Sequence, residues 1–383
     1  MRRRALALAR ALPKTELHLH LDGSLSAGFI ARRAVARGID LPCRPERVRH
    51  YLHGCKAALR AASDGAAPQL EHQNWGVFDF CNQFLMAAAE LREASADVAL
   101  RAAADNVRIC ELRFCPALHC REGLSERAAV HAVCDGLEDA RRAEPRLGAV
   151  GAILCALRSK SSAHGVATVE LAHACADRGV VGVDVAGDEG SWPLRRHLPM
   201  LVRAEELGVP MTLHAGEWPH PRFTSILENL ELALECGARR IGHGVALAHP
   251  EAAALRARAA ASGTLVEVCM TSNVGSGRVG SFAEHPVRTL LDAGVRCALS
   301  SDNLLLSGDA HLVAGATLEL ARFVDLVGCS EAEVKEVLLA GARASFCPGA
   351  AAVAVEMEAD IDRVLASAND DGSPAHGLLR TVY

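Results

Sequence analysis

Short apolar runs recur along the chain and alternate with longer segments in which apolar positions repeat every three or four residues. We expect β-strands over residues 15–21, 108–115, 149–157, 180–186, 210–214, 239–243, 264–269 and 295–300. The segments between them are rich in alanine and leucine, and 199–207 and 224–236 show the periodicity of amphipathic helices. Strand followed by helix, repeated eight times, predicts an α/β fold of the (β/α)8 class, the TIM barrel.

The spacing of three polar residues that follow apolar runs supports this architecture. His214 and His243 are 29 positions apart, and His243 and Asp302 are 59 apart. One strand–helix unit of such a barrel takes about 30 residues, so these residues are expected to end strands five, six and eight. The 194 positions from His20 to His214 exceed four units. We therefore expect a helical insertion at 25–107, after the first strand.

No linker rich in serine, glycine or proline divides the chain, so residues 1–383 are expected to form one barrel domain. The polar end, 367–383, is expected to be a loose tail. Much of the scarce aromatic content lies within the insertion, at 75–84. This run is either the packed face of a helix or a lid or wall for a flat, apolar substrate.

The first expected strand carries two histidines one residue apart, His18 and His20. Side chains of a strand alternate between its two faces, so both imidazoles project from one face and can hold one ion. Asp22, Gly23 and Ser24 then end the strand and begin a loop. Because active sites of barrels lie at the carboxyl ends of the strands, this loop is expected to open onto the site.

The expected strand ends bring together His18, His20, His214, His243 and Asp302. Imidazole and carboxylate ligands suit Zn²⁺. A second metal would need a further bridging ligand, often a modified lysine on the fourth strand, and residues 180–187 contain no lysine. We therefore expect a single zinc ion per chain. Asp302 considered alone could instead be a helix N-cap.

Glu217 lies three positions after His214, close enough for its carboxylate to face the same cavity. A partly buried glutamate beside a metal-activated water can serve as general acid and base. His243 could orient the attacking water, share in metal binding, or be an ordinary core histidine. Gly187, just past the fourth strand, is either a turn glycine or a point where substrate approaches the backbone.

Composition narrows the partners. The net charge of −5 and a pI near 6.4 give no reason to expect nucleic acid or an anionic membrane surface. No apolar run reaches the length of a membrane span. The 14 cysteines occur singly, without any CxxC pair, which favours reduced thiols in a cytoplasmic protein. Nothing demands more than a monomer.

Seven motifs occur in a characteristic order: PKTELHLHLDGS at 13–24, ELRF at 111–114, GVDVAGDE at 182–189, HAGE at 214–217, RIGHG at 240–244, SN at 272–273 and SSDN at 300–303. In these the chain resembles the adenosine deaminase family of the amidohydrolase superfamily, over residues 12–348. The resemblance implies zinc-dependent hydrolysis of adenosine and 2′-deoxyadenosine to inosine, 2′-deoxyinosine and ammonia, in purine salvage. The expected partner is therefore a small purine nucleoside.

The resemblance also implies roles for individual residues. His18, His20, His214 and Asp302 would hold the zinc ion. Glu217 would protonate purine N1, and His243 would orient the water that zinc activates. Four positions would contact the substrate: Asp22 at the ribose 5′-hydroxyl, the Gly187 backbone at N3, Asn303 at N7, and His20 beside the metal.

Two positions depart from the family pattern. Asn303 stands where many members have a second aspartate, although its NH₂ group can donate to N7. Met270 stands where proline is common. Adenine, an N6-substituted AMP and 6-aminodeoxyfutalosine therefore stay open as substrates, although the Asp22 carboxylate would repel a phosphate unless Arg or Lys compensates. A non-catalytic purine-binding barrel is the alternative outside enzymes.

Overall fold

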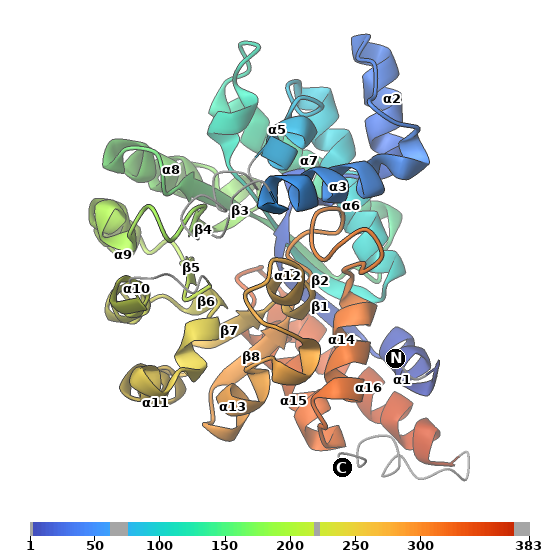
Figure 1. The fold of residues 1–383 in the computed structure, drawn as a ribbon, viewed down its shortest axis with the longest axis vertical. Coiled ribbons are helices and arrows are strands. Elements are labelled where there is room, and N and C mark those ends of the chain that lie inside the picture. Colours follow the sequence, from blue (N-terminus) through green and yellow to red (C-terminus); the bar gives the residue numbers. More distant parts are fainter. Residues whose placement is uncertain (1–2, 62–75, 218–222, 371–383) are drawn as a thin grey trace.

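Eight parallel strands follow one another in chain order at the centre of the molecule, with helices outside them (Figure 1). The computed structural model describes residues 3–61, 76–217 and 223–370. The strands are β1 (Lys14–His20), β2 (Val107–Phe114), β3 (Ala149–Leu157), β4 (Val180–Ala186), β5 (Thr212–Ala215), β6 (Arg240–His243), β7 (Leu265–Val268) and β8 (Arg296–Leu299). Each coincides with an expected run, so the predicted fold class is confirmed.

The strands form two four-stranded sheets, β1–β4 and β5–β8. Single bridges join the sheets at both seams, Val183 to Met211 and Leu19 to Asp302, and complete the circuit of the barrel. At the second seam, the Asp302 amide donates to the His18 carbonyl at 2.9 Å, and the His20 amide donates to the Asp302 carbonyl at 2.8 Å. The first strand is therefore fixed to the segment that follows the last one.

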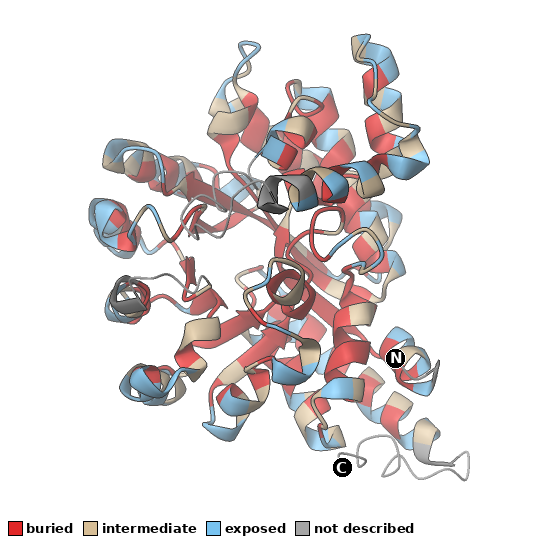
Figure 2. Cartoon of the chain, viewed as in Figure 1, coloured by how far each residue is buried: buried red, intermediate tan, exposed pale blue. Residues whose placement is uncertain are grey.

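Buried residues concentrate on the strands and on the inner faces of the surrounding helices (Figure 2). The outer helices are α1 (Arg3–Ala11), α7 (Glu126–Ala143), α8 (Ser162–Ala174), α9 (Leu198–Leu207), α10 (Phe223–Glu235), α11 (Ala253–Ser262), α13 (Val287–Asp292), α14 (Ala316–Leu326), α15 (Glu331–Ala344) and α16 (Ala350–Asp370). The expected helices at 199–207 and 224–236 correspond to α9 and α10. Serine side chains cap α7, α8 and α15 by accepting from backbone amides of the first turn.

The segment between β1 and β2 is helical where it is described, as expected of the insertion. It contains α2 (Ala27–Arg37), α3 (Val48–Ala61), α5 (Gly76–Asn82) and α6 (Ala88–Ala104). Residues 62–75, with the first aromatic residue of the 75–84 run, lie outside the described residues.

The expectation of a loose tail from residue 367 is wrong for its first residues. Helix α16 continues to Asp370, because the alanine-rich segment that begins at Ala350 propagates as one helix. Residues 371–383 lie outside the described part of the chain. Among the described helices, none combines the length and the apolar character needed to cross a bilayer.

Candidate active site

Four donor atoms converge at the carboxyl ends of the strands. His18 and His20 come from β1, His214 from β5, and Asp302 directly follows β8. The Nε2 atoms of His20 and His214 are 3.3 Å apart. Asp302 Oδ1 lies 3.6 Å from His18 Nε2 and 3.5 Å from His20 Nε2. Ligands about 2.0–2.1 Å from a tetrahedral metal ion are separated by about 3.3–3.4 Å, so these spacings fit one such ion.

The hydrogen bonding of these residues also fits a metal site. His18 Nε2 is buried and has no hydrogen-bond partner among the described residues. Its other ring nitrogen, Nδ1, lies 2.8 Å from Glu267 Oε2, so Nε2 is the atom left to bind an ion. Although burial favours a neutral acid, the surrounding imidazoles hold the pKa of Asp302 well below its usual value. The site thus offers neutral nitrogen donors and one anionic oxygen.

A buried set of charges beneath the donors orients the imidazoles. Arg113 of β2 donates to Glu267 Oε2 at 2.8 Å and to Asp184 Oδ2 at 2.7 Å. Glu267 contacts His18 Nδ1, and Asp184 Oδ2 lies 2.8 Å from His214 Nδ1. Carboxylates on the outer nitrogens of metal-binding histidines fix their tautomer and direction.

Sequence reasoning assigned no role to Arg113, Asp184 or Glu267. The available signal was a charged residue inside an apolar strand, as in ICELRF at 109–114 and LVEV at 265–268. Such residues are almost never fully buried unless they are paired.

Two site residues have strained backbones. His243 has φ of 65° and Asp302 has φ of 61°, in the left-handed region that side chains other than those of Gly, Asn and Asp seldom adopt. Such conformations persist where the surrounding structure over-determines them, and they cluster at functional sites. Here they turn both side chains out of their strand ends toward the metal donors.

Glu217 and His243 lie beside the donor cluster. Glu217 follows β5, and Glu189 Oε2 accepts its backbone N–H at 2.9 Å. Its Oε2 lies 3.7 Å from His243 Nε2. Burial raises the pKa of the Glu217 carboxyl to about 7. A carboxyl group in this condition can both deliver and accept a proton near neutral pH.

The donors open into a cavity of about 480 Å³. Its lining includes every residue expected to contact the substrate, namely His20, Asp22, Gly187 and Asn303, together with Glu217. A cavity of this size is within the range of small-molecule sites, about 300–1,000 Å³. Burial raises the pKa of Asp22 to about 6.

Asn303 is held at the cavity wall by a close approach of the backbone. A Cβ atom placed on Gly23 would lie only 1.5 Å from Asn303 Oδ1, so glycine is required there. Asn303 Oδ1 is itself buried, without a hydrogen-bond partner among the described residues. The amide is therefore poised to bind a polar atom in the cavity.

The two open sequence alternatives resolve as mixtures. Gly187 lines the cavity and also has φ of 110°, which a glycine turn favours. Of the aromatic run, Phe78 of α5 lines the cavity, whereas Phe84 is fully buried in the core. One part of the run therefore forms wall and another part packs.

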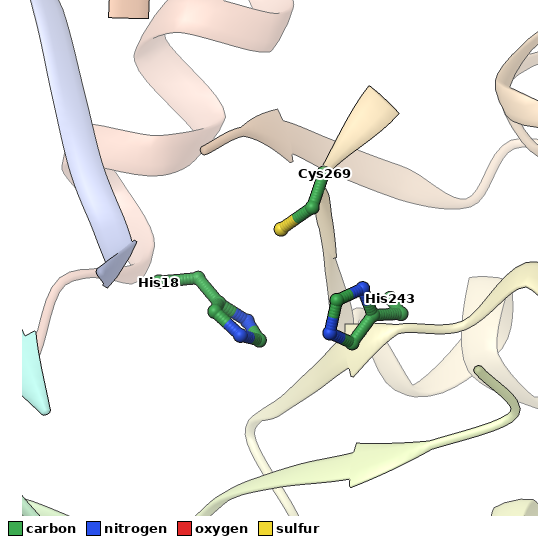
Figure 3. A group of neighbouring side chains, drawn as sticks. All are labelled: His18, His243 and Cys269. Carbon is green, nitrogen blue, oxygen red and sulfur yellow. The ribbon is translucent and has the colours of Figure 1, made fainter. Parts of the chain in front are cut away.

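His18, His243 and Cys269 form a second group with metal-binding atoms near one another (Figure 3). It competes with the first group, because both need His18 Nε2. Burial raises the pKa of the Cys269 thiol well above its usual value, which disfavours the thiolate that a metal requires. The cluster with His20, His214 and Asp302 is the better metal site.

Comparison with known proteins follows from this geometry. The adenosine deaminase family model matches residues 13–360. A curated adenosine deaminase from Enterococcus faecalis is 34% identical over 300 residues, covering 78% of this chain and 82% of that protein. Another from Lacticaseibacillus paracasei is 32% identical over 341 residues, covering 88% and 93%.

Solved structures share the fold at lower identity. An amidohydrolase from Burkholderia ambifaria with bound zinc has a TM-score of 0.77 at 23% identity, covering 96% of each chain. An Arabidopsis N6-mAMP deaminase has a TM-score of 0.76 at 24% identity, covering 93% of this chain and 99% of that one. An adenine deaminase from Arthrobacter aurescens has a TM-score of 0.74 at 23% identity, covering 92% and 98%.

Proposed function

Because the chain belongs to the adenosine deaminase family, we propose that it hydrolyses adenosine and 2′-deoxyadenosine to inosine or 2′-deoxyinosine and ammonia. The observation that carries the proposal is the position of Glu217. Its carboxyl lines the same cavity as His20, His214 and Asp302 and has a pKa near 7. Metal activation and proton delivery are thus available to one substrate.

We propose that the metal is zinc, one ion per chain, held by His18, His20, His214 and Asp302. Three imidazoles and one carboxylate at tetrahedral spacing support this choice. When bound, zinc lowers the pKa of a coordinated water toward about 7 and so supplies a nucleophile at neutral pH.

The chain's own residues then manage the protons. Glu217 donates a proton to purine N1 while water adds at C6, so negative charge does not accumulate on the ring. Loss of ammonia requires a second proton on the amino nitrogen, and Glu217 can relay the one released by the attacking water. His243 orients that water, since its Nε2 faces Glu217 across 3.7 Å.

Recognition of the nucleoside falls to the other cavity residues. The Gly187 backbone meets N3, the Asn303 amide donates to N7, and Asp22 accepts from the ribose 5′-hydroxyl. His20 lies beside the purine as well as holding the metal. All four line the described cavity, which supports their assignment.

One observation favours a second candidate, a 6-aminopurine nucleotide. Lys56 and Arg278 both line the cavity and could offset the repulsion between Asp22 and a phosphate. Lys56 Nζ already donates to the Leu306 carbonyl at 2.7 Å, however, and the nearby acids outnumber these cations. The neutral nucleoside is therefore the preferred substrate.

The proposal also includes purine salvage and a cytoplasmic location. All fourteen cysteines are free, and most are buried, as suits a reducing compartment.

A steady-state comparison of adenosine, 2′-deoxyadenosine, adenine, AMP, N6-methyl-AMP and 6-aminodeoxyfutalosine tests the substrate. We expect the two nucleosides to show the highest kcat/KM for ammonia release. A rival turning over far faster would replace them. Purified protein that neither contains stoichiometric zinc nor turns over any of these compounds after zinc is added would favour a binding protein instead.

A further inference from the structure

His243 is useful to the proposed reaction only in one of its neutral forms. A neutral imidazole carries its proton on either Nδ1 or Nε2, and the other nitrogen can only accept. Nε2 is the atom that faces the site, 3.7 Å from Glu217 Oε2. It can donate to the attacking water only if the proton resides there, so something must keep Nδ1 unprotonated.

A chain of three buried hydrogen bonds leads away from Nδ1. His243 Nδ1 lies 3.1 Å from Nδ2 of Asn273, a residue of α12 (Met270–Gly275). Asn273 Oδ1 lies 3.2 Å from His285 Nε2. At the far end, the backbone N–H of Val287 donates to His285 Nδ1 at 3.2 Å.

The direction of every bond follows from the last one. A backbone N–H can only donate, so His285 Nδ1 accepts and the ring proton of neutral His285 is on Nε2. That N–H donates to Asn273 Oδ1, which turns the amide NH₂ toward His243 Nδ1. The opposite amide orientation would place two donors, or two acceptors, against each other at one end of the chain.

The relay is shielded from competition by water. Asn273 is fully buried and His285 is 5% exposed. Burial lowers the pKa of His285 to about 4, so the ring is neutral at working pH. In a dry setting an unmatched donor or acceptor costs about 1–3 kcal/mol, which holds the chain in its matched arrangement.

We propose that Asn273 and His285 are positioning residues that fix His243 as the Nε2-protonated tautomer, and so make it a hydrogen-bond donor toward the reacting water. The inference deepens the proposed function and rests on it for the role of that water. Neither residue lines the cavity, so each acts through His243 alone.

The decisive variant is Asn273→Asp. A carboxylate has nearly the same shape but only accepts, so it would draw the His243 proton to Nδ1 and leave Nε2 an acceptor. We expect kcat for adenosine to fall about 10²-fold or more, in line with other wrong-tautomer variants. We expect little change in KM and in zinc content. The matched control is Asn106→Asp, which alters an amide bonded to the Ala11 carbonyl, far from the site.

A second readout does not depend on activity. Nitrogen NMR of 15N-histidine-labelled protein, with His243 assigned by difference from His243→Gln, reports which nitrogen carries the proton. We expect Nε2 in the wild type and Nδ1 in Asn273→Asp. An unchanged His243 signal together with kcat within about threefold of wild type would overturn the proposal.

A pair of changes at His285 covers the case in which Asn273→Asp does not fold. His285→Gln keeps an N–H donor that can reach Asn273 Oδ1, whereas His285→Phe removes it. We expect the glutamine variant to retain much more of kcat and the wild-type tautomer; equal losses in both would contradict the relay. If the wild type fails to deaminate adenosine, the NMR result still decides the tautomer, while the proposed function fails separately.

Discussion

The metal donors and the outer wall of the cavity are held in different ways. The donors stand at strand ends, and buried side chains inside the barrel fix them: Glu267 and Asp184 behind His18 and His214, with Arg113 between. The wall is built from the insertion and from the loop after β8, and its fixing bonds run from one helix to main-chain carbonyls. The reactive centre is therefore part of the barrel, whereas the wall depends on an added clamp.

That clamp is centred on Arg49 of α3. Its guanidinium donates to five main-chain carbonyls of the loop after Asn303, those of Leu304, Leu305, Ser307, Asp309 and Leu312, at 2.5–3.1 Å. His53 and Lys56, one and two turns further along α3, contact the carbonyls of Leu305 and Leu306. The amides of Leu305 and Leu306 donate to the Gly23 carbonyl, so the loop is held from two sides. Removing one side should move the wall and leave the metal donors in place.

The largest effect is expected at the reactive centre itself. Glu217→Gln removes the proton that passes to the ring but preserves the shape of the side chain. We expect kcat to fall at least about 10²-fold while zinc stays bound. Steady-state kinetics with zinc analysis of the same sample measures both. Near-normal turnover by this variant would contradict the acid–base role.

The next effect concerns the support of the donors. Glu267→Gln weakens the contact to His18 Nδ1 and leaves Arg113 without part of its counter-charge. We expect zinc affinity to fall about 10–100-fold, measured by competition with a chelator. Asp139→Asn, in the exposed ion pair with Arg92, is the control and should leave affinity unchanged. Equal affinity in both variants would show that Glu267 does not support the metal.

A smaller and different effect is expected for the clamp. Arg49→Met frees five carbonyls and lets the loop that carries Asn303 shift, whereas the bonds of Asp302 to β1 persist. We expect KM for adenosine to rise about tenfold, the cost of roughly one charged hydrogen bond to substrate, with little change in zinc affinity. Arg32→Met, in an exposed pair with Glu93 on the same insertion, is the matched control. Loss of zinc from Arg49→Met would contradict the separation of centre and wall.

The mildest test uses pH. Glu217 must be protonated to act as the acid, and burial raises its pKa to about 7, so kcat should decline as pH rises through that value. The same shift affects stability: the contribution of this group is complete below about pH 4.5 and is lost as pH rises through about 7. Kinetic and thermal profiles from pH 5 to 9 measure both. A kcat that stays level from pH 6 to 9 would argue against Glu217 as the acid.

The comparison also explains what the sequence could predict. Strand periodicity and unit spacing locate all eight strands and place His18, His20, His214 and Asp302 on one end, because these signals are local or follow from the repeat. The partners of buried charges are not local. Nothing near Glu267 in sequence says that it meets His18, 249 positions away.

The same limit applies to the relay and to the clamp. The pair Ser272-Asn273 was recognised as a motif, but the orientation of the Asn273 amide depends on His285 and on one backbone N–H of the next helix. Arg49 looks like any cation on an amphipathic helix. Its importance comes from carbonyls that the loop after β8 presents more than 250 positions later.

The seam between β1 and β8 has a consequence for how the molecule is made. Asp302 bridges Leu19, and the ion proposed here would join residues 18 and 302, near opposite ends of the polypeptide. During synthesis the first two imidazoles emerge long before the carboxylate that completes their set. Tight loading must therefore wait until the last strand arrives, and an ion bound only by the finished barrel stabilises it against reopening. Cofactor uptake would then report the end of folding.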